Sequence, residues 1–368
     1  MSDFRAFLVG KWDAAAAAAG MLRSSPSEAK RRILDGSLQL LVQYNPAHIA
    51  ISHDEVLCEL RFPDDDTENK EGTGQLQFEA PTSEVLPQHA VLINVSPLVR
   101  YWLPQSWMSV MTMKLMRGHS LFVLDLPLLK PQRLDKKLLQ YGIEVVDAMH
   151  DPHFALGFNS SGAWASVNHF HLQGFLMDEL HGLLSGSPKR FPILNQQRSE
   201  RFRFGSVVVY DFPSWPMRCY AVGIDTSTTQ QKSKDSHERD ALVNSVWRFV
   251  ELLQTRNVAH NALIAHDELD SPLVIVFPRQ LQRESGLGLV EHGRDVTTTA
   301  VSSSGGLRFA IAELAGLVIA GNERTFHGFT QDQYARILET ELSLSEDEMN
   351  DLTALWRRQL ETINGNLS

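Results

Sequence analysis

Short apolar runs of strand length recur along the whole chain, and they restrict its fold more than any other feature. Turn-forming or polar residues bound each run, as is typical of strands in a sheet. Helical segments lie between the runs without the strict strand–helix alternation of a parallel sheet, which favours the α+β class. The expected strands are LQLLVQY, EVLCELRF, AVLINV, HSLFVLDLP, FALGFN, NHFHLQGF, RFRFGSVVVYDF, MRCYAVGI, NALIAHD and PLVIVFP.

Helices are predicted near both ends of the chain and in two internal segments. The alanines from 14 to 19 have high helix propensity. Ser345 followed by Glu348 is the pattern of a capping box at a helix start. The expected helices are 5–24, a short one through Arg31 and Arg32, 132–150, 237–254, 330–341 and 345–362.

The charge balance and the cysteines exclude several classes of function. The 368 residues include 34 Lys and Arg against 44 Asp and Glu, and the formal net charge of −10 would repel a nucleic-acid backbone. Cys58 and Cys219 form neither a disulfide framework nor a CxxC zinc motif. The apolar stretch 309–321 is shorter than the ~20 residues that span a membrane. We therefore expect a cytoplasmic protein that binds neither nucleic acid nor membrane.

The segment NHFHLQGF carries the most informative polar side chains. Residues two apart on a strand point to the same face, so His169, His171 and Gln173 form one row. Phe170 and Leu172 point to the opposite face, toward a core. A neutral imidazole is a competent nucleophile at physiological pH. The row therefore predicts phosphoryl or nucleotidyl transfer, with His171 attacking phosphorus and its two neighbours binding the non-bridging oxygens.

The preceding loop adds small polar groups that suit a phosphate site. Asn159, Ser160 and Ser166 are short donors, and Gly157 and Gly162 allow the backbone to approach a ligand closely.

Two other interpretations of the histidine pair stay open on the pattern alone. Two histidines on a strand are also typical of a hydrogen-bonded structural pair. His169 and His171 together with His153 or His181 would have the composition of a metal site.

Several motifs of the chain, in their order, resemble the GDP-hexose phosphorylases. These are INVSP, GHSLFVLDLP, PQRL, FALGFNSSGAWASVNHFHLQGF and NVAHNALI. The family comprises GDP-D-glucose phosphorylases of animals and GDP-L-galactose phosphorylases of plants. It belongs to the histidine-triad superfamily, in the branch of galactose-1-phosphate uridylyltransferase. The resemblance extends from about residue 49 to the last helices.

The resemblance implies a mechanism with two displacements and a role for each residue of the row. His171 corresponds to the histidine that forms a covalent guanylyl intermediate, His169 to the first histidine of the triad, and Gln173 to its third position. Asn159 and Ser166 correspond to residues that contact phosphate. The substrates implied are a GDP-hexose and inorganic phosphate, and no cofactor or metal is implied.

The resemblance also implies two histidine-triad-like halves, residues 1–185 and 186–368, each an antiparallel sheet flanked by helices. The second half repeats the apolar pattern of the first without a second HxHxQ. Asn261 and Arg279 in that half are candidate ligand contacts, although we expect them at a solvated rim. His260, His266 and His292 share no spacing and are expected at the surface.

His119 is a further candidate for the pocket, but relatives have the Gly-His pair closer to the SPL motif. The extra residues between Pro97 and Gly118 indicate an insertion. We predict a GDP-D-glucose phosphorylase. The alternatives are a GDP-L-galactose phosphorylase, a histidine-triad nucleotide hydrolase, a dinucleoside polyphosphate phosphorylase and a non-catalytic nucleotide-binding protein.

Overall fold

A computed structural model gives the fold of most of the second half and of the segments that carry the predicted site. The residues it describes are 4–17, 28–45, 89–93, 115–124, 130–165, 170–225, 236–282, 287, 290–291, 294–295 and 307–365. The predicted strand EVLCELRF and nearly all of the insertion after Pro97 lie outside these residues.

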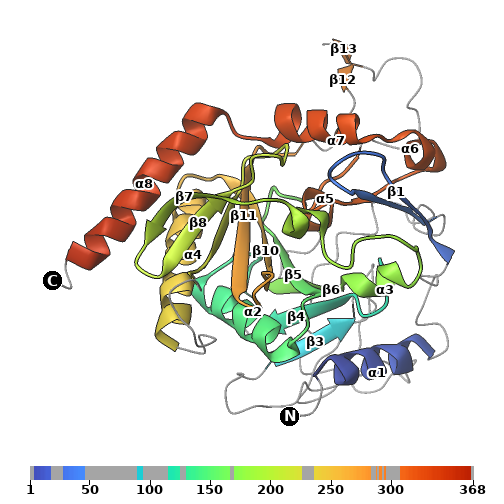
Figure 1. Cartoon of the computed structure of the whole chain (residues 1–368), viewed down its shortest axis with the longest axis horizontal. Helices are drawn as coiled ribbons and strands as arrows, with labels where there is room; N and C mark the ends of the chain where they lie inside the picture. Colours follow the sequence, from blue (N-terminus) through green and yellow to red (C-terminus); the bar gives the residue numbers. More distant parts are fainter. Residues whose placement is uncertain are drawn as a thin grey trace, which may run out of the picture.

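The centre of the molecule is one nine-stranded sheet in which all neighbouring strands are antiparallel (Figure 1). The strand order is β3-β4-β6-β5-β10-β11-β9-β8-β7. The strands are β3 (His89–Ile93), β4 (Ser120–Leu124), β5 (Phe154–Asn159), β6 (His171–Leu176), β7 (Ser199–Phe204), β8 (Val207–Asp211), β9 (Tyr220–Ile224), β10 (Ala259–His266) and β11 (Pro272–Arg279).

Eight of the nine strands belong to two copies of one ββαββ unit, and β7 adds to the edge of the second copy by pairing with β8. The first contains β3, β4, α2 (Lys136–Met149), β5 and β6, and the second contains β8, β9, α4 (Ser236–Thr255), β10 and β11. Both units have the same spatial order, with the fourth strand between the second and third. The prediction of two related halves is confirmed, but β5 and β10 pair so that the halves share one sheet. The exact boundary at residues 185 and 186 stays a prediction.

Alternating side chains of the sheet enter two separate cores. Leu156 and Phe158 face α2, α4 and the C-terminal helix α8 (Glu346–Gly365). Ala155 and Leu263 face the opposite core. That core lies under a small sheet and several short helices (Figure 1). They are β1 (Lys30–Ile33), β2 (Leu41–Tyr44), β14 (Leu317–Ile319), α5 (Ile311–Leu314), α6 (Glu323–Gly328) and α7 (Gln331–Ile337), with α3 (Met177–His181) after β6.

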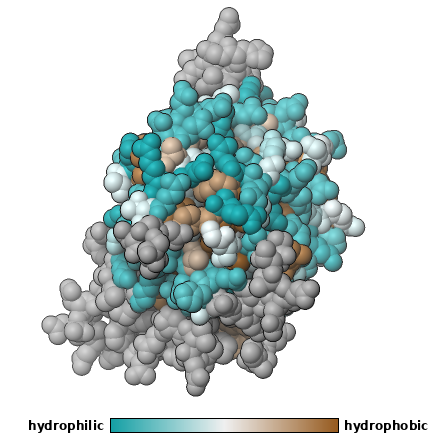
Figure 2. All heavy atoms as spheres, turned by 60° about the vertical axis from the view of Figure 1, so that its left-hand side comes forward, coloured by the Kyte–Doolittle hydropathy of each residue, from teal (hydrophilic) through white to brown (hydrophobic). Residues whose placement is uncertain are grey.

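The C-terminal helix α8 confirms the predicted capping box. Ser345 Oγ accepts a hydrogen bond from Glu348 N at 3.2 Å, and the Glu348 carboxylate accepts one from Ser345 N at 2.8 Å. Trp356 then anchors the helix, stacking on Phe249 at 4.4 Å and donating to Ser245 O. Hydrophilic side chains dominate the described surface on the side of α8, where hydrophobic ones show only as small areas (Figure 2). Among the described residues, no helix has the length and hydropathy to cross a membrane.

The short helix predicted through Arg31 and Arg32 is wrong, because these residues lie in β1. Their partners explain the difference. Arg32 donates to the carbonyls of Phe326 and Phe329 in and after α6, and Arg31 Nε donates to the side chain of Gln43 on β2 at 2.8 Å. Contacts with distant elements therefore determine the local conformation here.

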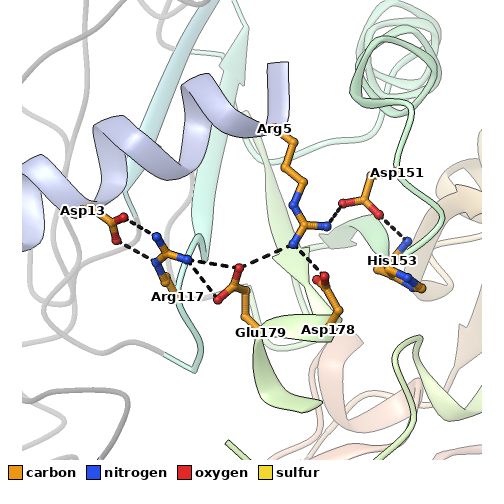
Figure 3. Close-up of polar contacts among 7 residues, drawn as sticks. All are labelled: Arg5, Asp13, Arg117, Asp151, His153, Asp178 and Glu179. Carbon is orange, nitrogen blue, oxygen red and sulfur yellow. Dashed lines mark hydrogen bonds and ion pairs between the residues drawn. The ribbon is translucent and has the colours of Figure 1, made fainter. Parts of the chain in front are cut away.

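The N-terminal helix α1 (Phe4–Ala17) is held by two arginines that share an acidic partner, Glu179 (Figure 3). Arg5 pairs with Asp151 and with Asp178, the latter at 2.6 Å. Arg117, from the turn before β4, pairs with Asp13 of α1. These ion pairs join α1 to the segments that precede β4 and β5 and to α3.

The two arginines of this network differ in burial, which predicts different contributions to stability. Arg5 is 27% exposed and its partner Asp151 only 6%, whereas Arg117 and Asp13 are 40% and 45% exposed. We expect Arg5→Ala to lower the free energy of unfolding by about 2 kcal/mol, since it leaves a buried carboxylate unpaired. Arg117→Ala, the matched control, should cost at most about 1 kcal/mol. Urea unfolding measures both, and equal losses would contradict this assignment.

Candidate functional site

The predicted row on NHFHLQGF is present in part on β6. His171 and Gln173 lie two residues apart on the face that also carries Phe175, which belongs to the core under α5. His171 is 4% exposed and Gln173 is half-buried. The apolar neighbours Phe170 and Leu172 enter the opposite core, as predicted. His169 lies outside the described residues.

Asn159 comes from the end of β5, the strand next to β6. The printed β5–β6 pairing ends with Gly157 opposite Gln173, and Asn159 and His171 each lie two residues beyond this pair, on the same face of the sheet. Directly opposite residues of antiparallel strands point to the same face. The side chains of Asn159 and His171 are both buried. The structure therefore brings three of the predicted residues to one place on the sheet.

Gln132, in the PQRL segment before α2, joins the two strands at this point, and no role was predicted for it. Its Nε2 donates to Asn159 O and to His171 O, both at 3.1 Å. Its Oε1 accepts from His171 N at 2.9 Å. The carboxamide thus stands between the ends of β5 and β6 and sets the separation of their backbones.

Ser160 is buried next to Asn159, and its hydroxyl forms hydrogen bonds with backbone groups. Oγ accepts from His260 N at 3.0 Å and lies 3.2 Å from Ser161 O. These bonds extend the pairing of β5 with β10 by one residue. The other predicted serine, Ser166, lies outside the described residues.

His119 lies on the same face of the sheet, after the segment predicted to be an insertion. Its ring stacks on Phe175 at 4.8 Å and is 3% exposed. A turn at Gly118, with φ of +79°, leads the chain to this position. His119 therefore lies at the Phe175 end of the face that carries His171 and Gln173.

Gly157 contacts protein atoms where close approach to a ligand was expected. A Cβ atom at Gly157 would lie 2.5 Å from Ile311 Cγ2 and 3.1 Å from Phe175. The glycine therefore lets α5 pack directly on β5. Gly162 has φ of +78° and supplies the turn after Ser161, and Trp164 follows in a left-handed conformation with Arg308 stacked on its ring at 4.4 Å.

Asn261 and Arg279 are buried, so the expected position at a solvated rim is wrong. They are 0% and 1% exposed and lie on the same face as Asn159. Burial lowers the pKa of Arg279 to about 10, and the guanidinium stays charged at neutral pH. Burial also raises the pKa of the nearby Glu313 carboxyl to about 7.

Because the pKa of the Glu313 carboxyl is raised in the folded protein, we expect the free energy of unfolding to depend on pH. Its pKa is 4.5 in the unfolded chain and about 7 in the folded protein. The folded protein therefore binds more protons between these values. The stabilisation is complete below pH 4.5 and is lost as the pH rises through 7. Between pH 5 and 8 the free energy of unfolding of the wild type should fall by about 2 kcal/mol because of this group. The Glu313→Gln variant should not show this fall. Urea unfolding at both pH values measures the difference, and parallel pH profiles would refute it.

The alternative metal site includes His169, which lies outside the described residues. Among the residues that the structure describes, no three His, Cys, Asp or Glu side chains are grouped so as to hold a metal ion. His181 Nδ1 lies 2.7 Å from Ser187 O in the turn after α3, and Asp151 accepts from His153 N.

Two protein-family models match the chain. The model described as "GDPGP1-like, N-terminal domain" matches residues 112–175, which include β4, α2, β5 and β6. The model described as "GDPGP1-like, C-terminal domain" matches residues 193–362. Together they cover 234 of the 368 residues (64 and 170).

Several curated relatives, all named as phosphorylases, match most of the chain at low sequence identity. GDP-D-glucose phosphorylase 1 of Xenopus laevis is 28% identical over 72% of this chain and 54% of its own length. GDP-L-galactose phosphorylase 1 of Arabidopsis thaliana is 25% identical over 76% and 53%. The chain thus spans about half the length of these two relatives. The zebrafish (Danio rerio) GDP-D-glucose phosphorylase 1 is 25% identical over 89% of this chain and 83% of its own.

A solved structure has the same fold. Yeast Ap4A phosphorylase Apa2, in a crystal structure with AMP, aligns with a TM-score of 0.52 at 15% identity, over 92% of this chain and 95% of that one.

Proposed function

The chain belongs to the GDPGP1-like family, and from this premise we propose that it is a GDP-D-glucose phosphorylase with His171 as its nucleophile. The observation that carries the proposal is the group formed by His171, Gln173 and Asn159 at the ends of β6 and β5. It combines one imidazole with two carboxamides, which are the groups needed to attack phosphorus and to bind its oxygens.

The proposed reaction has two displacements at the α-phosphorus. In the first, an imidazole nitrogen of His171 forms a bond to phosphorus, and the bond to the bridging oxygen breaks to release hexose 1-phosphate. In the second, an oxygen of inorganic phosphate attacks the same phosphorus, the P–N bond breaks and GDP leaves. The sum is GDP-hexose plus phosphate giving GDP plus hexose 1-phosphate.

Gln173 suits this chemistry because the leaving group needs no proton. The second pKa of a phosphate monoester is about 6, so hexose 1-phosphate leaves as a stable anion at neutral pH. An amide can donate a hydrogen bond to a phosphate oxygen but cannot supply a proton. Gln173, Asn159 and His169 are therefore assigned to the non-bridging oxygens, with Ser160 and Ser166 beside them.

Composition and packing support three further assignments, which concern the pocket wall, the size of the substrate and the location of the protein. His119 and Asn261 belong to the wall of the pocket, and the former lies against Phe175. The net charge of −10 supports a small phosphorylated substrate over nucleic acid. The low number of cysteines supports a cytoplasmic location.

GDP-L-galactose is the second candidate substrate, since an Arabidopsis relative of similar identity has that name. Values of kcat/KM for the two GDP-hexoses, with and without phosphate, decide between them.

The mass of the intact protein after mixing with GDP-D-glucose, without phosphate, tests the mechanism. We expect a GMP adduct that is discharged as GDP when phosphate is added. GMP release without phosphate would indicate a hydrolase. Binding of GDP without any adduct would indicate a nucleotide-binding protein and overturn the proposal.

A further inference from the structure

Two carboxamides, Asn159 and Asn261, lie side by side where the halves of the sheet join, and their partners fix the orientation of each. Ile311 N donates to Asn159 Oδ1 at 2.8 Å, and Ala163 O accepts from Asn261 Nδ2 at 3.0 Å. A backbone amide only donates and a carbonyl only accepts, so both orientations are unambiguous. The 2.7 Å bond from Asn261 Nδ2 to Asn159 Oδ1 therefore runs from the second half to the first.

Arg279 supplies a charge at the other end of this chain of hydrogen bonds. Its Nη1 donates to Asn261 Oδ1 at 3.3 Å and to Phe309 O at 2.6 Å, and its Nη2 donates to Gln282 Oε1 at 2.9 Å. Its hydrogen-bond partners are therefore neutral oxygens, and among the described residues only the carboxyl of Glu313 interacts with it as a charge, without forming a close ion pair. The buried charge polarises Asn261 and, through it, Asn159 in the same direction.

We infer that Arg279 and Asn261 are positioning residues that direct the amide nitrogen of Asn159 at the phosphate of the substrate. The inference rests on the proposed function, in which Asn159 binds a phosphate oxygen. Two donors occupy Asn159 Oδ1, and no described residue accepts a hydrogen bond from its Nδ2. The second half, which has no HxHxQ, thus contributes to phosphate binding through side chains that do not touch the phosphate.

A double-mutant cycle with Asn261→Asp and Asn159→Ala tests this coupling. Asn261→Asp keeps the shape and the bond from Arg279 but replaces the donor to Asn159 by an acceptor. Asn159 should then turn its Nδ2 inward and its oxygen toward the phosphate. We expect kcat/KM for GDP-D-glucose to fall about 100-fold in the wild-type background, mostly through kcat. In the Asn159→Ala background the same change should cost less than about three-fold.

Thr353→Val is the matched control, because it also removes a buried hydrogen bond, here 2.7 Å long between Thr353 and Tyr220. It should lower stability and leave kcat unchanged. Equal losses from Asn261→Asp in both backgrounds would overturn the inference. If Asn261→Asp does not fold, Arg279→Lys takes its place in the cycle, since one ammonium group cannot reproduce the planar set of bonds.

If the wild-type protein neither turns over GDP-D-glucose nor binds GMP, the proposed function is wrong. The claim that Asn159 is directed at a phosphate is then wrong as well. The orientation itself is then decided by exchange of side-chain NH2 protons in ¹H–¹⁵N spectra. Slow exchange for Asn261 and fast exchange for Asn159 are expected. The reverse order would overturn the chain of hydrogen bonds as well.

Discussion

His171→Asn is expected to abolish phosphorolysis of GDP-D-glucose and to prevent the GMP adduct, in a protein that still folds. Asparagine stays polar and fits the space of the imidazole, but its amide nitrogen is not a nucleophile. The loss of a nucleophile that acts with its neighbours costs on the order of 10⁴-fold or more in kcat. Initial rates of GDP formation and the mass of the intact protein measure the two effects.

Gln173→Ala is the control on the same face of β6. Removing one donor to a phosphate oxygen costs about 10²–10³-fold in kcat, but the variant should still form the adduct because the nucleophile remains. A His171→Asn variant that keeps the adduct would place the nucleophile elsewhere. His119 would then be the first residue to replace, since it lies against Phe175 on the same face.

The local part of the site could be predicted from the sequence. The two-residue period of a strand places His171 and Gln173 on one face and Leu172 on the other, whatever the rest of the fold. The capping box at Ser345 is local in the same sense, because its donor and acceptor are three residues apart. Patterns of this kind are contained in a few adjacent residues.

The predictions that were wrong concern side chains whose positions depend on residues far apart in the chain. His260 and His266 were expected at the surface, but both are 2% exposed. His266 is buried with a partner, since its Nε2 lies 2.8 Å from Asp147 Oδ1. His260 stacks on Phe158, and burial lowers its pKa to about 4. No spacing in the sequence indicates these contacts. His292 lies outside the described residues.

Gln132 is the clearest residue that sequence patterns missed, because it is 39 residues away from the strand that it holds. One carboxamide bonds to Asn159 O, His171 O and His171 N. It is 3% exposed, so bulk water does not reach these bonds in the folded protein. The position of the nucleophile relative to Asn159 therefore depends on one side chain from outside the sheet.

Gln132→Leu is expected to reduce kcat/KM about 100-fold, with Kd for GMP changed far less. Leucine fills a similar volume but bonds to none of the three backbone groups. Leaving buried polar groups unsatisfied costs about 1–3 kcal/mol each, so β5 and β6 should shift until they pair with each other or admit water. A shift of about 1 Å between reacting groups costs about 10²-fold in rate. Steady-state kinetics and calorimetric titration with GMP measure the two quantities.

Gln254→Leu separates positioning from stability, because the hydrogen bonds of the Gln254 side chain go to Arg133 and Leu134 and not to the backbones of β5 and β6. Its Nε2 donates to Leu134 O at 2.7 Å and its Oε1 accepts from Arg133. Both substitutions should lower the urea midpoint, but only Gln132→Leu should lower kcat in the folded protein. Equal kinetic losses would show that Gln132 acts through stability alone. Rates restored in Gln132→Leu by a lower temperature would show the same, since a misplaced nucleophile is not corrected by stabilising the fold.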